Sequence, residues 1–190
     1  MSHNFILDSI FHLWLFAIDQ ELAESTKSKG CPHCGGRLDK AVYSRSPSGL
    51  PPSLREYYES RLSFCCANCR KRITPPSVRF FGRRWFPAPL FLFICLLQCG
   101  INERRLAQIK RHFGIRVSES TWKRWRRWWR ESFCATPFWQ AQNGLVAVTL
   151  KKNIVLPRAL WHCFKGTLEE RMCLLLRFLS PLTTNVFRTV

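Results

Sequence analysis

The chain has 190 residues and a formal net charge of +18, because 30 Lys and Arg stand against 12 Asp and Glu. This length suits one ordinary domain or two small ones, and a hydrophobic content of 46% excludes general disorder. A chain so basic repels itself, and the usual partner that relieves the repulsion is a polyanion such as nucleic acid. Composition alone leaves a ribosome-like or membrane-surface basic protein as an alternative.

The apolar segments are poor candidates for a secretory signal or a membrane span. Residues 5–18 lack a positive flank and contain Asp8 and His12, which is unlike a signal peptide. The run from Ala88 to Gly100 is apolar over about ten to twelve residues, whereas a membrane-spanning helix needs roughly 18–20. We therefore expect a cytoplasmic protein with no membrane partner.

Residues 1–29 predict an N-terminal helix followed by a linker. Over residues 4–24 the apolar residues recur at helical intervals. The residues that we expect to form the buried stripe are Phe5, Ile6, Ile10, Leu13, Trp14 and Ala17. The sequence STKSKG, residues 25–30, is typical of a linker. Residues 30–85 then contain short runs broken by Pro, Gly and Ser, which predict a small β-rich module with an insertion at residues 44–60.

Two C-x-x-C pairs lie in this module. The pairs in GCPHCGG and CCANCRK are about 30 residues apart, a spacing typical of a structural zinc site that takes four tetrahedral sulfur ligands. The predicted ligands are Cys31, Cys34, Cys66 and Cys69. Two cysteines in a C-x-x-C pair reach one ion only if the chain turns sharply between them, and we call this turn a knuckle. A knuckle needs a residue near its end that can adopt positive φ, and we expect Gly35, Gly36 and Asn68 to do so. A four-cysteine site is closed, so it has no open position for a catalytic water.

Other assignments of the cysteines remain alternatives. Cys65 would replace Cys66 if the second pair were C-x3-C, although strand alternation places Phe64 and Cys66 on one face and Cys65 on the other. His33 lies inside the first knuckle and is expected to point outward. The remaining cysteines lie in apolar segments, where free thiols behave as small core residues, so we favour a metal and reduced thiols over disulfides.

Residues 86–133 predict a three-helix, helix-turn-helix unit. An apolar helix at about 90–99 comes first, and Leu106, Ile109 and Phe113 then form the stripe of a second helix that ends at Gly114. Ser118 is a good N-cap for a third helix. Its buried stripe is expected to contain Trp122, Trp125 and Trp129. Residues 134–190 predict an irregular tail followed by a helix with a Thr167–Glu170 capping box, the apolar residues Leu168, Met172, Leu175, Leu176 and Leu179, and a stop at Pro181.

Between Gly100 and Ser132 there are ten Lys or Arg and three Glu. This excess of positive charge is larger than an ordinary solvated helix face requires. The third helix of a helix-turn-helix unit enters the major groove, where arginine recognises guanine. We expect base contacts from Ser120, Thr121, Lys123 and Arg124. Phosphate contacts are expected from Arg70, Lys71, Arg72, Arg79, Arg83, Arg84, Arg104, Arg105, Arg116, Arg126, Arg127 and Arg130.

These motifs carry a family resemblance. The N-terminal zinc ribbon of insertion-sequence transposases is similar to the order CPHCGG, a second C-x-x-C and then RKRITPPSVRFFGRRWFPAPLFLFICLL in this chain. The helix-turn-helix arms of transposases and resolvases are similar to the segment GIRVSESTWKRW. The likeness covers about residues 30–132 and extends to short stand-alone bacterial zinc-ribbon proteins. It implies DNA recognition, a transposase or recombinase as a possible partner, and association with the bacterial nucleoid.

Catalysis is not carried over by the resemblance. Transposase chemistry requires three carboxylates that hold Mg²⁺ in an RNase H-like domain. The only aspartates here are Asp8, Asp19 and Asp39, no acid lies between Glu131 and Glu169, and the tail is too short for such a domain. The sequence therefore predicts a non-enzymatic protein.

The predicted fold is a small α+β protein in which a four-cysteine zinc ribbon (30–85) precedes the helix-turn-helix unit (86–133), flanked by the N-terminal segment (1–29) and the tail (134–190). The predicted function is zinc-stabilised binding of double-stranded DNA by a mobile-element accessory protein or a transcriptional regulator. Two alternatives are an RNA-binding or ribosome-associated zinc ribbon, and an assembly adaptor whose N-terminal and 167–180 helices dock a partner.

Overall fold

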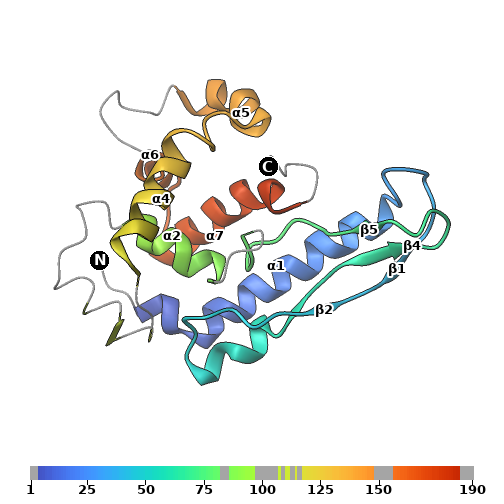
Figure 1. Ribbon diagram of the computed structural model, residues 1–190, viewed down its shortest axis with the longest axis horizontal. Coiled ribbons are helices and arrows are strands. Elements are labelled where there is room, and N and C mark those ends of the chain that lie inside the picture. Colours follow the sequence, from blue (N-terminus) through green and yellow to red (C-terminus); the bar gives the residue numbers. More distant parts are fainter. Residues whose placement is uncertain are drawn as a thin grey trace.

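A long helix joins a β module to a helical module. The computed structural model describes residues 4–81, 86–96, 107, 110, 111, 114, 117–147 and 156–184. Helix α1 (Ser9–Ser28), preceded by the 3-10 helix η1 (Asn4–Leu7), runs from the helical module to the β module at the opposite end (Figure 1). The described residues therefore form a small α+β protein, as predicted.

Helix α1 buries a different face from the one predicted. Its buried residues are Phe11, His12, Leu15, Asp19 and Ala23. By contrast, Ile10, Leu13 and Trp14 of the predicted stripe are 58%, 50% and 51% exposed. Ala17 is exposed as well, whereas Phe5 and Ile6, which precede α1, are buried as predicted. Two polar residues, whose partners lie far along the chain, determine which face of α1 is buried. The apolar pattern alone therefore predicted the wrong face for α1. The predicted linker is also wrong over residues 25–28, which form the last turn of α1 before Gly30 (φ 74°).

One of these polar residues is His12, which is 1% exposed. Its Nδ1 lies 2.8 Å from the Tyr58 hydroxyl and its Nε2 lies 2.7 Å from the Ile6 carbonyl oxygen. Burial lowers the pKa of His12, so the imidazole is neutral at pH 7. Tyr58 belongs to the 3-10 helix η2 (Pro52–Tyr58), so the insertion at residues 44–60 is packed against α1 through a buried hydrogen bond.

The second polar residue is Asp19, which is 3% exposed and forms an ion pair with the 1% exposed Arg79 at 2.8 Å. The carboxylate also accepts hydrogen bonds from the Val78 backbone N–H (2.7 Å) and the Ser77 hydroxyl (2.6 Å). Arg79 donates to the Tyr57 carbonyl and lies over the Phe16 ring at 4.7 Å. This pair fastens residues 77–79, which we call the strap, to the middle of α1.

The β module is an interrupted antiparallel ribbon. Strand β4 (Phe64–Cys66) pairs with β1 (Leu38–Lys40) on one side and with β5 (Arg72–Ile73) on the other. The short strands β2 (Tyr43–Ser44) and β3 (Ser60–Arg61) continue the ribbon beyond β1 and β4. Leu38 faces Cys66 in the register, which brings the two knuckles together. A small hydrophobic cluster beneath them contains Ala23 of α1, Cys31, Leu38, Phe64 and Cys66.

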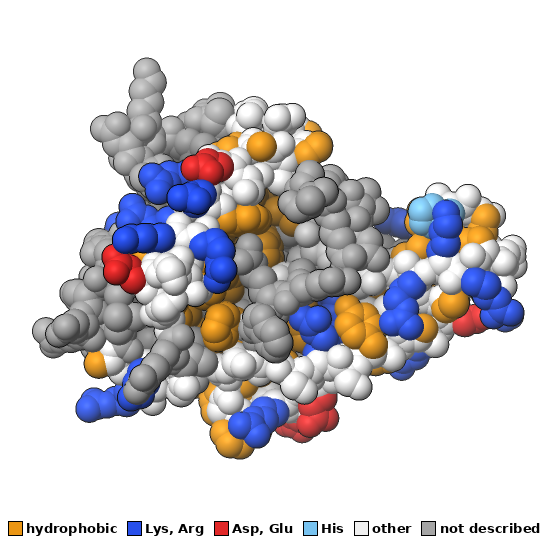
Figure 2. Space-filling model, viewed as in Figure 1, with side chains coloured by type: hydrophobic (Ala, Val, Ile, Leu, Met, Phe, Trp, Pro, Cys, Tyr) orange, Lys and Arg blue, Asp and Glu red, His pale blue; other side chains and the backbone are white. Residues whose placement is uncertain are grey.

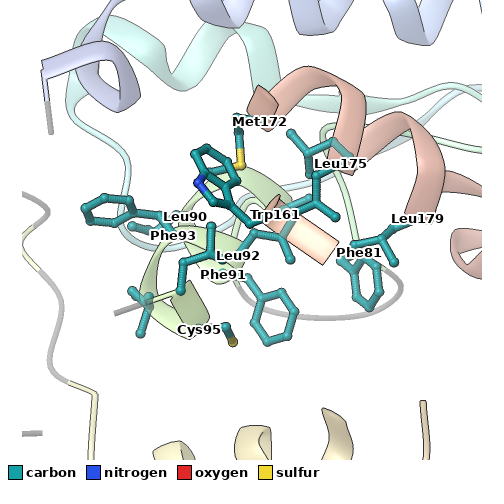
Figure 3. Packing of buried hydrophobic residues seen from close by; sticks show 14 of the residues in the cluster. Phe81, Leu90, Phe91, Leu92, Phe93, Cys95, Trp161, Met172, Leu175 and Leu179 are labelled. Atoms are coloured by element: carbon teal, nitrogen blue, oxygen red, sulfur yellow. The ribbon is translucent and has the colours of Figure 1, made fainter. Parts of the chain in front are cut away.

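Helix α2 (Ala88–Leu96) is the centre of the main core. All of its residues are buried, which explains its continuous apolar sequence. Figure 3 shows Phe91 and Cys95 on the side of α2 turned away from Met172 and Leu175. The Phe91 ring lies 5.0 Å from that of Trp125 and is stacked on Trp129 at 6.4 Å. On one side α2 therefore packs against the helix that contains Trp125 and Trp129, and on the other side against the helix that contains Met172 and Leu175.

One of those helices is α4 (Glu119–Arg130), which confirms the predicted third helix. The Ser118 hydroxyl accepts a hydrogen bond from the Thr121 backbone N–H, as an N-cap does, and Trp122, Trp125 and Trp129 are buried. The second predicted helix lies largely outside the described residues. Gly114 adopts φ 65° and its N–H donates to the Lys110 carbonyl, which is consistent with a helix end there. The complete helix-turn-helix arrangement stays a prediction.

The tail is more helical than predicted. Helix α5 (Pro137–Ala147) lies within the part expected to be irregular, and α6 (Arg158–Cys163) precedes α7 (Leu168–Leu179). Helix α7 and its Thr167–Glu170 capping box are as predicted, and Met172, Leu175, Leu176 and Leu179 of its predicted stripe are buried, whereas Leu168 is half-buried. The 3-10 helix η3 (Ser180–Thr183) follows. The Thr183 hydroxyl oxygen lies 2.9 Å from the backbone N–H of Ser77, so the end of the tail closes on the strap next to α1.

Candidate metal centre and basic surface

The structure brings together the four predicted metal ligands. The sulfurs of Cys31, Cys34, Cys66 and Cys69 all lie within 4.8 Å of one another. The Sγ atoms of Cys31 and Cys69 are 3.6 Å apart, and those of Cys34 and Cys66 are 3.5 Å apart. A disulfide would require about 2.05 Å. Four sulfurs at about 2.3 Å from one tetrahedral ion are about 3.8 Å apart, so the cluster has the size of a metal site.

Each knuckle is closed by the same kind of backbone hydrogen bond. The N–H of Gly35 donates to the Cys31 carbonyl, and the N–H of Arg70 donates to the Cys66 carbonyl. The residue after the second cysteine has positive φ in both knuckles, 70° at Gly35 and 58° at Arg70. The predicted position of this conformation, Asn68, is therefore wrong by two residues. Arg70 occupies a left-handed conformation that costs a residue with a side chain about 1–2 kcal/mol.

Asn68 and Gly36 instead determine how closely the knuckles approach. A Cβ added at Gly36 would lie 2.8 Å from the Asn68 Nδ2 atom and 3.1 Å from the Cys66 sulfur. Only glycine leaves room for the ligand at this position. Gly35, in contrast, has open space where a Cβ would be, so its requirement is conformational alone. The sequence Gly35-Gly36 thus meets two different needs.

The thiols of the cluster differ in acidity. Hydrogen bonds from the backbone N–H groups of Cys69 and Asn68 lower the pKa of Cys66 to about 6. At Cys69 the backbone N–H of Lys71 favours the thiolate, but burial and the other three thiols outweigh it and raise the pKa to about 12. Sulfurs this close ionise together only if a cation neutralises them. The cluster can therefore hold a metal ion chemically as well as geometrically.

The other cysteines in the described part of the chain lie outside this cluster, as does His33. The Cys65 sulfur lies 3.5 Å from the Arg70 carbonyl oxygen, on the opposite strand face from Cys66, and His33 is exposed. Burial raises the pKa of the free thiols Cys134, Cys163 and Cys173, with Cys173 at about 11. These thiols are therefore protonated at neutral pH, in agreement with their expected role in packing.

The basic residues predicted to contact DNA from the ribbon and the segment after it are partly exposed and partly buried in the structure. Arg70, Lys71 and Arg72 are exposed, and the Arg72 guanidinium lies 5.6 Å from the centre of the Tyr43 ring. Arg79 was expected to contact a phosphate, and this expectation is wrong because its guanidinium is buried against Asp19. The predicted contacts Arg83, Arg84, Arg104, Arg105 and Arg116 lie outside the described residues.

On α4 the three tryptophans of the predicted stripe are buried, and the charged side chains are exposed. Ser120, Lys123, Arg124 and Arg127 are exposed and Thr121 is half-buried. Lys123 forms an exposed ion pair with Glu119 at 2.9 Å, and the Arg124 guanidinium donates to the Thr121 hydroxyl at 3.3 Å. Arg126 and Arg130 are also exposed. The predicted base-contacting residues therefore lie together near the start of the helix.

Lys and Arg side chains gather at both ends of one molecular face. Figure 2 shows one group over α4 and another over the β ribbon, with acidic side chains beside both groups. Sequence reasoning missed the role of α1, whose Ala23 packs under the metal cluster while Asp19 fixes the strap. No pattern in the sequence indicates these pairings, because the partners are far apart along the chain.

Among the helices in the described part of the chain, none combines the length and the apolar character needed to cross a bilayer. No family model, no curated protein and no solved structure matches this chain.

Proposed function

We propose that this chain is a non-catalytic, zinc-stabilised protein that binds duplex DNA, as a mobile-element accessory protein or a transcriptional regulator. The observation that carries the proposal is the placement of exposed Lys and Arg on α4 and on the ribbon, on one face of the molecule (Figure 2). A net charge of +18 makes such a face attractive to a polyanion over a long range.

Zinc is the metal that four clustered thiolates favour most among abundant cellular ions, because it accepts tetrahedral sulfur ligands without redox change. Four protein ligands complete its coordination, so the ion is structural. It would hold the two knuckles together and thereby fix the exposed Arg70, Lys71 and Arg72. These cations exceed what is needed to balance the charge of about −2 on a zinc tetrathiolate.

Helix α4 has the properties of a groove-reading helix. Its tryptophan side is packed against α2, which fixes its orientation, and the opposite side presents Lys123, Arg124 and Arg127 to solvent. Its first turn offers the hydroxyls of Ser120 and Thr121 beside Arg124. Arginine and hydroxyl side chains near the start of such a helix are suited to base edges, and the later cations are suited to phosphates.

A salt titration of duplex binding tests this proposal. We expect log K to fall linearly with log salt, and replacing Arg70, Lys71 and Arg72 by Gln to reduce the slope by about 0.9 for each phosphate that these side chains neutralise. Lys123→Ala with Arg124→Ala should reduce sequence preference. Arg177→Gln is the control, because its charge is already paired with Glu21 at 3.3 Å. A slope near zero, or stronger binding to single-stranded RNA than to duplex, would reject duplex binding.

A second candidate function is assembly with a protein partner. It is favoured by Ile10, Leu13 and Trp14, which stand exposed on one side of α1 at the spacing of a helix that docks in an apolar groove. Helix α7, which the adaptor hypothesis also invoked, buries its apolar face and is unsuited to docking. The proposed occupant is an apolar groove on the transposase or recombinase of the same element. Leu13→Ser should abolish the complex in size-exclusion chromatography and leave DNA affinity unchanged; no complex with that enzyme would refute this candidate.

A further inference from the structure

The four cysteines of the metal cluster differ in their access to solvent. Cys34 is exposed and Cys69 is half-buried, whereas Cys31 and Cys66 are buried. A soluble oxidant therefore meets Cys34 first, and a buried sulfur reacts with a neighbour that has already been oxidised. Because the four sulfurs all lie within 4.8 Å of one another, every ligand has such a neighbour.

Two short sulfur contacts cross from one knuckle to the other. The Cys34 sulfur lies 3.5 Å from that of Cys66, and the Cys31 sulfur lies 3.6 Å from that of Cys69. A disulfide bond is about 2.05 Å long, so the two sulfurs of a pair must move roughly 1.5 Å closer. Rotation of the cysteine side chains can supply this movement while the backbone of both knuckles stays in place.

Hydrogen bonds of the backbone hold the knuckles side by side. The N–H of Ala67 in the second knuckle donates to the carbonyl of Arg37, just after the first knuckle, at 2.9 Å, and Leu38 pairs with Cys66 in the ribbon. A disulfide between Cys34 and Cys66 joins residues 32 positions apart, whereas one inside a knuckle closes only a C-x-x-C turn. A cross-link that closes a longer loop restricts the unfolded chain more, so the crossed pairing is the more stable product.

We propose that the four-cysteine centre is also a site of oxidation by peroxides, where a disulfide between Cys34 and Cys66 forms first and replaces the ion as the link between the knuckles. The Cys34 thiolate attacks one oxygen of hydrogen peroxide, the O–O bond breaks, hydroxide leaves, and Cys34 becomes a sulfenic acid. The Cys66 thiolate then attacks the Cys34 sulfur. The S–S bond forms, the S–O bond breaks, and a second hydroxide leaves. Each hydroxide takes a proton from solvent, so the two sulfurs lose two electrons and one peroxide is reduced to two waters.

This disulfide leaves the cluster with two thiolates, too few to hold a zinc ion. With a second peroxide, Cys31 and Cys69 form the other crossed disulfide by the same two steps. Cys65 takes no part, because its sulfur is on the opposite strand face, 3.5 Å from the Arg70 carbonyl oxygen. The oxidised ribbon therefore remains closed and keeps its exposed cations in place without a metal.

Disulfide mapping of the full chain, after treatment with one equivalent of hydrogen peroxide, tests this proposal. Trypsin cleaves after Lys and Arg, so the first knuckle lies in peptide 30–37 and the second in peptide 62–70. A crossed disulfide links these two peptides, whereas a disulfide inside a knuckle leaves them separate. We expect the linked pair, with fragment ions that assign Cys34 and Cys66. We also expect release of about one zinc ion for each peroxide consumed, measured with a chromogenic chelator.

The matched control is Cys65→Ser, which removes the half-buried thiol next to Cys66 and should give the same linked pair at the same rate. Cys34→Ser removes the exposed sulfur and should slow the reaction, with a link between Cys31 and Cys69 as the product. With excess chelator present, the oxidised parent should unfold about 4–16 °C above the reduced parent, because the disulfide then does what the ion did.

Four outcomes would overturn the proposal: only unlinked peptides, a link through Cys65, unmodified cysteines after peroxide treatment, or equal unfolding temperatures of the oxidised and reduced chains in chelator. The inference rests on the metal site of the proposed function, but the two can fail separately. A chain that binds zinc and DNA and gives one of these outcomes would refute the oxidation alone. A chain that is purified without zinc and still gives the linked pair would refute the zinc assignment alone.

Discussion

The ion pair between Asp19 and Arg79 gives the most demanding test of the fold. Replacing Asp19 by Asn keeps the size of the side chain but removes the charge that neutralises a guanidinium only 1% exposed. Removing one partner of a buried pair costs about 3–5 kcal/mol, because the other charge is left without compensation. For a chain of this length each kcal/mol lowers Tm by about 2–4 °C, so the expected loss is about 6–20 °C.

Thermal unfolding followed by circular dichroism measures this loss directly. The control is Glu21→Gln on the same helix, which breaks an exposed ion pair with Arg177 worth about 0–1 kcal/mol. Arg79→Met should also destabilise strongly, and the double variant with Asp19→Asn should lose less than the sum of the two single losses. An Asp19→Asn shift no larger than that of Glu21→Gln would show that the pair is not buried as described, and the account of α1 would fail.

Three further predictions concern the metal centre and the interior. Cys66→Ser should abolish stoichiometric zinc, measured by elemental analysis, whereas Cys65→Ser should retain it; equal zinc contents would contradict the ligand assignment. Gly36→Ala should weaken zinc affinity in a chelator competition more than Gly35→Ala, because only its Cβ would meet the Cys66 sulfur; the reverse order would disprove the steric argument. Burial lowers the pKa of His12, so the unfolded chain gains a proton before the folded chain as pH falls below about 6.5, and stability is lost there. Denaturation of His12→Gln should show a shallower loss between pH 7 and pH 5 than the parent, and parallel curves would exclude this contribution.

The features that follow from the sequence are those determined over short distances. The two C-x-x-C pairs identify the four sulfurs that come together. One antiparallel ribbon, in which Leu38 pairs with Cys66, is enough to bring the two pairs side by side. The capping box at Thr167 and the tryptophan spacing in α4 are likewise local, and the structure confirms both. The sequence analysis missed α5, although a local signal for its start exists: Thr136 precedes Pro137, and its hydroxyl accepts a hydrogen bond from the Trp139 N–H.

Features that depend on distant partners could not be predicted in this way. Nearly every residue of FILDSIFHLWLFAI is apolar, so helical spacing alone allows more than one buried face. The face is chosen by His12 and Asp19, whose partners are 46 and 60 residues further along the chain. The same pairing removes Arg79 from the surface, although its basic neighbourhood predicted a phosphate contact. A single arginine in a basic run carries no local sign of its buried acid.

The hydrogen bond between Thr183 and Ser77 has a consequence for how the protein is made. These residues are 106 positions apart, so the strap cannot acquire this partner until Thr183 has been synthesised. The cysteine knuckles need only the part of the chain up to Cys69 and can take up their ion while the rest is still on the ribosome. Folding would therefore proceed in two stages, with the cysteine knuckles able to bind a metal first and the strap fixed later, when Thr183 reaches Ser77.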